Sequence, residues 1–113
     1  MGLDMWAFKV KPNEEVELTD KNEICYWRKN NALHGWVSDQ YPDSENNCEN
    51  LLLTKQMLLQ LQKDVEVGLK PTEGFFFGGQ VYLPEEQAKD RVFVKEALEL
   101  IEQGYNIYYR AWW

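Results

Sequence analysis

The stretch YNIYYRAWW, residues Tyr105 to Trp113, decides the fold of this chain. Its aromatic and apolar residues are typical of a β-strand. Strand alternation would place Tyr108, Arg110 and Trp112 on one face. It would place these residues on the other face: Tyr105, Ile107, Tyr109, Ala111 and Trp113. A strand with so little charge is either central in a sheet or covered by a second subunit, so a homodimer through it is one hypothesis.

The other end of the chain carries a similar segment. Residues Leu3 to Val10, LDMWAFKV, are short and rich in large apolar side chains, which predicts a second strand. We expect these first and last strands to lie side by side at the centre of one sheet. Residues 23–27 are a shorter strand candidate or the lead into a helix, and residues 51–53 are a further short strand candidate.

Helical patterns fill the middle of the chain. A short helix is expected over 29–40, and longer helices follow Thr54 and Pro84, which are suited to a helix N-cap and to a first turn respectively. Gly104 is suited to end the last of them. Strands at both ends with helices between predict the α+β class. The expected architecture is a small, mainly antiparallel sheet, N- and C-terminal strands included, packed by two long helices and one short helix in a single domain, residues 1–113.

Composition and charge limit the function classes. The chain has 113 residues, with 19 Asp and Glu against 12 Lys and Arg, and a net charge of −7. Binding of a nucleic-acid polymer or an anionic membrane requires a basic surface, so neither partner is expected. No leader peptide or membrane-spanning stretch is recognised, and Cys25 and Cys48 match no redox or zinc motif. These features predict a cytoplasmic protein with reduced thiols.

No motif for a cofactor or a metal ion is found. Residues 43–49 alternate acidic and polar groups like a calcium loop, but Cys48 stands where that loop needs glycine. His34 with Asp39 and Asp43 leaves a weak metal site as an alternative to a solvated acidic loop. We therefore predict no cofactor and no metal.

The densest mixture of aromatic and polar residues is Tyr26 to Trp36. A helix beginning near Trp27 would put Trp27, Asn31 and His34 on one face, at spacings of four and three residues. Arg28 and Lys29 would lie beside them, while Leu33, Trp36 and Val37 would face the core. Such a face can stack on a planar ring and bind its charged or polar edge. The alternative is that these residues only pack the core and cap backbone groups.

Three consecutive phenylalanines, Phe75, Phe76 and Phe77, lie between glycines in the segment TEGFFFGG, residues 72–79. The segment is not a phosphate-binding loop, because it lacks a Lys-Ser or Lys-Thr ending. In a strand, Phe75 and Phe77 would face one side and Phe76 the other. The segment is therefore either packed in the core or presents one ring to a pocket or partner.

Five of these features occur together in one order: Gly2–Met5, Tyr26–Trp36, Cys48, Pro71–Gly78 and Tyr108–Trp113. Their motifs are an MGLDM start, YWRKxNxxHxW, a single later Cys, PTxGFFFG and a Tyr-Tyr…Trp end. This pattern resembles a family of small uncharacterised proteins of bacteriophages and prophages.

The resemblance implies a location in the host cytoplasm and one shared pocket. The residues of that pocket would be Asp4, Trp27, Arg28, Lys29, Asn31, His34, Phe75, Phe76 and Phe77.

Three functions follow as hypotheses. The first is a non-enzymatic binding protein whose aromatic and polar pocket takes a small planar or phosphorylated, nucleotide-like host molecule. The second is an acidic protein–protein inhibitor of a host enzyme that uses exposed aromatic residues. The third is a small hydrolase-like enzyme with His34 as acid or base.

Overall fold

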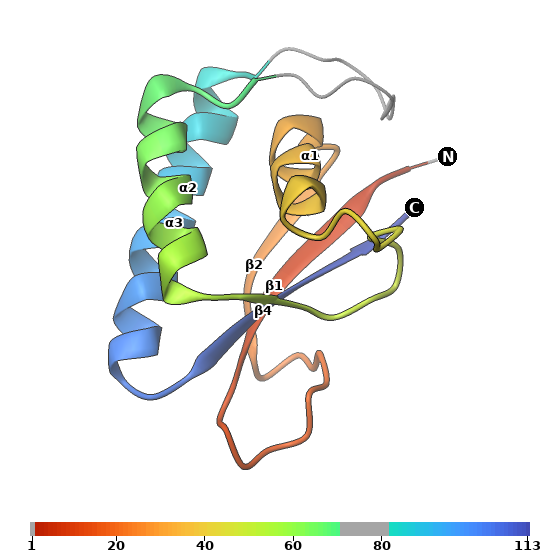
Figure 1. Ribbon diagram of the computed structural model, residues 1–113, viewed down its shortest axis with the longest axis vertical. Coiled ribbons are helices and arrows are strands. Elements are labelled where there is room, and N and C mark those ends of the chain that lie inside the picture. Colours follow the sequence, from red (N-terminus) through yellow and green to blue (C-terminus); the bar gives the residue numbers. More distant parts are fainter. Residues whose placement is uncertain (1, 71–81) are drawn as a thin grey trace.

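The computed structural model describes residues 2–70 and 82–113 (Figure 1). Four strands and three helices occur in these residues. In chain order they are β1 (Asp4–Val10), β2 (Glu23–Arg28), α1 (Asn31–Gln40), β3 (Leu51–Leu53), α2 (Lys55–Val67), α3 (Pro84–Glu102) and β4 (Asn106–Trp112). The predicted α+β class is confirmed.

The strands form one antiparallel sheet in the order β2-β1-β4-β3. The first and last strands are thus the two central ones, with Met5 opposite Ala111 and Ala7 opposite Tyr109. Strand β4 pairs with β1 on one side and with β3 on the other, and beyond β3 the Cys48 N–H donates to the Ala111 carbonyl at 2.6 Å. This central position accounts for the composition of β4 without a second subunit. The homodimer stays a prediction.

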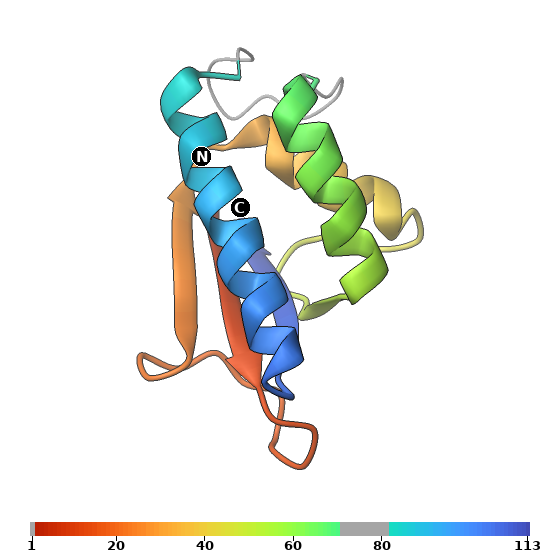
Figure 2. The same ribbon diagram turned by 90° about the vertical axis from the view of Figure 1, so that its left-hand side faces the viewer.

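The two faces of the sheet have different neighbours. One face of the sheet, which we call the covered face, packs in a single hydrophobic core with apolar residues of α1, α2 and α3. Figure 2 shows α3 crossing in front of the sheet on this side, with α2 beside it. The strand residues of the covered face are Met5, Ala7, Trp27, Leu51, Leu53, Ile107, Tyr109 and Ala111.

The strand register places the alternate residues of the strands on the opposite face, which we call the open face. Trp6 lies between Tyr26 and Arg110, and Asp4 lies between Arg28 and Trp112. The open face also contains Phe8, Tyr108 and Leu52, which lie opposite one another across neighbouring strands. Phe8 is buried, at the end of the sheet where the long connection between β1 and β2 departs. The other members of the open face are half-buried or exposed.

Helix α1 begins later than the sequence analysis expected. Residues Trp27 and Arg28 belong to β2, Lys29 has a positive φ of 57°, and Asn30 caps the helix by accepting a hydrogen bond from the Leu33 N–H at 3.1 Å. The predicted helical face of Trp27, Asn31 and His34 is therefore wrong. The positive φ at position 29 breaks the helical path, and a capping Asn fixes the new start.

The longer helices follow their sequence signals. Thr54 caps α2 by accepting from the Met57 N–H at 3.2 Å, and Glu86 accepts from the Leu83 N–H at 2.9 Å at the start of α3. Gly104, with φ of 97°, lets the chain turn sharply from α3 into β4. Among the described residues no helix is long and apolar enough to cross a membrane.

Candidate functional site

Trp27 is a core residue of the covered face. Its side chain is 2% exposed, and its ring meets Phe93 of α3 edge-on, with ring centroids 4.8 Å apart. The indole Nε1–H donates to Asp90 Oδ1 at 2.8 Å. A ligand could not stack on this indole without displacing α3, so the packing alternative describes Trp27.

Asp90 is the centre of a buried polar cluster. Its carboxylate also accepts from Asn30 Nδ2, at 3.1 and 3.0 Å, and from the Tyr82 hydroxyl. Burial raises the pKa of Asp90, and the hydrogen bonds from Tyr82, Asn30 and Trp27 oppose that rise. Because Asn30 is also the N-cap of α1, this Asp90 cluster connects α3 to β2 and to the start of α1.

His34 lies in a second buried cluster on the covered face, against Tyr109 of β4. Its Nδ1 is 2.7 Å from the Tyr109 hydroxyl and 3.3 Å from Asn46 Nδ2, which also donates to Ser38 Oγ at 2.8 Å. Burial lowers the pKa of His34 to about 4, so the imidazole is neutral at pH 7. These contacts give His34 a packing role within the fold.

The remaining predicted site residues are divided between the core and the surface. Asn31 is buried at the start of α1, whereas Asp4, Arg28 and Lys29 lie near the surface. Asp4 accepts a hydrogen bond from the Tyr26 hydroxyl and stands opposite Arg28 across the strand pair.

Phe75, Phe76 and Phe77 lie outside the described residues. The other predicted residues do not surround one described hollow: Trp27 and Arg28 share a hollow of about 200 Å³, and Asp4 lines another of about 240 Å³ beside Trp112.

The open face is the largest aromatic surface among the described residues of the sheet. Trp112 is 62% exposed and Tyr26 is 39% exposed, and the Tyr26 ring lies against Trp6 with centroids 5.6 Å apart. Tyr108 stacks on Phe8 at the same centroid distance, and Arg110 Nη1 donates to Asn50 Oδ1 at 3.0 Å. Fixed, half-exposed aromatic rings with an arginine among them are the side chains enriched in protein interfaces.

In each of the two edge strands, β2 and β3, one backbone carbonyl accepts a hydrogen bond from a side chain. Lys89 of α3 donates to the Tyr26 carbonyl in β2, and the Tyr41 hydroxyl donates to the Leu52 carbonyl in β3. Each of these bonds occupies a backbone acceptor of an edge strand, and a lysine at an edge is a common device against strand pairing. A partner would therefore meet the face of this sheet more readily than its edges.

Metal-ligating side chains and thiols are described for residues 2–70 and 82–113. No group of three His, Cys, Asp or Glu side chains could hold a metal ion there. Both cysteines are free, and burial raises the pKa of Cys25 to about 12. No family model, curated protein or solved structure matches the chain.

Three of the nine residues of the open face were predicted to lie together. The alternation in β4 predicted that Tyr108, Arg110 and Trp112 share a side, and this is confirmed. Tyr26 was not placed on this face because residues 23–27 were read as a strand or as the lead into a helix, and no face was predicted for Trp6. The Asp90 cluster was missed too, although Asp90 stands four and seven residues before the buried Val94 and Ala97, which placed an acid in the apolar stripe of α3.

Proposed function

We propose that this protein is a non-enzymatic binding protein that docks onto a basic partner protein through the open face of its sheet. The observation that carries the proposal is a partly exposed aromatic surface that includes Trp6, Tyr26 and Trp112, on a sheet whose two edge strands each have one carbonyl bonded to a side chain. Exposed apolar patches of this kind mark interaction sites on soluble proteins.

Charge supports a basic partner. The connection at residues 11–22 carries four acidic and two basic side chains, and residues 41–50 carry three acidic and no basic ones. These segments border the sheet at one end and along β4, as the Asn50–Arg110 and Cys48–Ala111 contacts show. With a net charge of −7, the molecule attracts a positively charged surface and raises its rate of encounter.

The two arginines of the open face complete the binding surface. Neither Arg28 nor Arg110 takes part in an ion pair within the described residues, whose two salt bridges are Lys55–Glu102 and Arg91–Glu66. Their guanidinium groups can therefore donate hydrogen bonds to backbone carbonyls of a partner, or stack on its aromatic rings. Arginine beside tyrosine and tryptophan is typical of residues that dominate binding energy.

Site-specific photo-crosslinking in the producing cell tests this proposal. A benzophenone amino acid replaces Trp112 or Tyr26 on the open face, and Val92 on α3 is the matched control because it is 65% exposed against 62% for Trp112. We expect one basic protein to be crosslinked from both open-face positions and not from Val92. Equal capture from Val92, or capture of an acidic protein, contradicts the proposal. Crosslinking to a second copy of the chain replaces it with the homodimer.

A pocket for a small phosphorylated or planar molecule is the second candidate. Trp27, Arg28 and Lys89 line the hollow of about 200 Å³ together with Asn30, Glu85 and Glu86. The hollow is smaller than usual ligand sites, which measure roughly 300–1,000 Å³, and its two glutamates offset the attraction of Arg28 and Lys89 for a phosphate. A rise in melting temperature with a nucleotide, abolished in Arg28→Ala, would favour this candidate over docking.

A further inference from the structure

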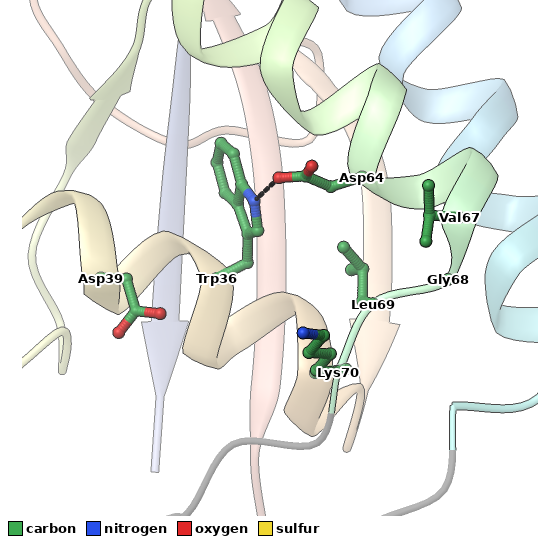
Figure 3. Close-up of a pocket in the computed structure, with 8 residues that line it drawn as sticks. Trp36, Asp39, Asp64, Val67, Gly68, Leu69 and Lys70 are labelled. Carbon is green, nitrogen blue, oxygen red and sulfur yellow. Dashed lines mark hydrogen bonds between the residues drawn. The ribbon is translucent and has the colours of Figure 1, made fainter.

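A separate hollow of about 430 Å³ lies between α1 and the end of α2. In Figure 3 the Trp36 indole projects from α1 toward Asp64 on α2, while Leu69 and Lys70 lie on the segment that follows α2. The volume is in the range of small-molecule sites. The residues that line the hollow are Ala32, Trp36, Asp39, Asp64, Val67, Gly68, Leu69 and Lys70. We propose that it binds a small organic cation, an ammonium or guanidinium group on an apolar stem.

A hydrogen-bonded pair fixes the geometry of the site. The Trp36 Nε1–H donates to Asp64 Oδ2 at 2.8 Å, and Gln60 Nε2 donates to Asp64 Oδ1 at 3.0 Å. Both donors are neutral, so the carboxylate is oriented without being neutralised. An indole held beside an oriented carboxylate presents two groups that attract the same ligand charge, the negative π-face and the anion.

The charge of the lining selects a cation. Asp39 follows Trp36 by three residues, so the two project from the same side of α1. Neither Asp39 nor Asp64 forms a salt bridge within the described residues. Lys70 is the one basic residue among the described residues that line the hollow. Two carboxylates against one ammonium leave the hollow with a net negative charge, which repels a phosphate and favours a monocation.

The apolar part of the lining specifies the stem of the ligand. Leu69 is buried, and Val67 at the mouth is 86% exposed. An alkyl or aryl stem would cover Val67 and lie against Leu69 and the indole, while its charged end faces the carboxylates. This site is on the helix side of the sheet, so it is independent of docking through the open face.

The test uses benzylamine as the probe and benzyl alcohol as its uncharged counterpart. The indole N–H resonance of Trp36 is identified by its loss in Trp36→Phe and followed by NMR titration. We expect benzylamine to shift it saturably and benzyl alcohol to leave it in place. Asp39→Asn should weaken benzylamine binding about fivefold, the size expected for one partly exposed charge pair, and Glu99→Gln on α3 should not.

Three results overturn the inference. An absent response to benzylamine shows that the hollow does not bind the cation. An equal response to benzyl alcohol shows that any binding is apolar only. Equal affinity in the native protein and in both Asp39→Asn and Asp64→Asn shows that the carboxylates do not recognise the charge. None of these results bears on the crosslinking from the open face.

Discussion

The covered and open faces of the sheet use the same residue types for different purposes. On the covered face the polar atoms of Trp27 and Tyr109 have buried partners, Asp90 and His34. On the open face Tyr26 and Trp112 keep much of their surface in water. A buried aromatic side chain with a polar atom needs a partner for that atom, whereas an exposed one does not. The comparison separates residues that hold the fold from residues available to a partner.

The largest effect is expected at Asp90. Asp90→Ala leaves the donors of Trp27, Asn30 and Tyr82 without their shared acceptor, so we expect a loss of about 3–5 kcal/mol in the free energy of unfolding. Denaturant unfolding measures the loss. Glu96→Ala, exposed on the same helix, is the control and should change stability by less than about 0.5 kcal/mol. A loss below about 1 kcal/mol for Asp90→Ala would show that the Asp90 cluster is not a main support of the fold.

The next effect is the response of His34 to pH. Its pKa is about 4 in the folded state, below the ordinary value of 6.5, so the unfolded chain binds this proton more tightly. The contribution of His34 is therefore present above pH 6.5 and is lost as the pH falls toward 4, by about 3 kcal/mol in total. Unfolding curves across this range for the native protein and for His34→Gln isolate the contribution. Parallel curves for the two proteins would show that His34 is not buried as described.

A smaller effect is expected at Tyr109. Tyr109→Phe keeps the ring in the core and removes only the hydroxyl that meets His34 Nδ1. The expected loss is about 1–2 kcal/mol, the cost of one buried hydrogen bond whose partner remains. Tyr108→Phe, the neighbouring residue on the open face, is the matched control. Equal losses for the two variants would contradict the distinction between the faces.

The smallest effect on stability is expected at the most exposed large side chain of the open face. Trp112→Ser should change the free energy of unfolding by less than about 0.5 kcal/mol, because the indole makes few buried contacts. The same substitution should weaken binding to the crosslinked partner by about 2 kcal/mol or more. Stability is measured by denaturation and affinity by titration calorimetry. A stable variant with unchanged affinity would remove Trp112 from the binding surface.

The fold was more accessible to sequence reasoning than the site. Alternation in residues 105–113 and the cap at Thr54 are local signals, and the elements that they predicted are present. The start of α1 depended on the backbone of Lys29, whose positive φ leaves no clear mark in the sequence. The sharing of Asp90 by Trp27 and Tyr82 joins segments far apart in the chain, which periodicity alone does not bring together.

The grouping of the candidate site residues was also predicted incorrectly, because the start of α1 was placed too early. The sequence placed Trp27, Asn31 and His34 in one group, because spacing was counted as if all three were helical. The strand that contains Trp27 turns its neighbours Tyr26 and Arg28 to the opposite face. The helix start was predicted too early, near Trp27 instead of at Asn31. Because successive side chains of a strand point to opposite faces, this error grouped core residues as a site and left out the surface residues beside them.

The central pairing of β1 with β4 also governs when this protein can fold during its synthesis. Asp4 leaves the ribosome more than 100 residues before its partner Trp112. Until β4 emerges, β1 and β2 can form only a two-stranded hairpin, and β3 has no neighbour in the sheet. Isolated hairpins are marginally stable in water. The four-stranded sheet therefore cannot be completed until residue 112 is released, although the three described helices that pack on it are synthesised earlier.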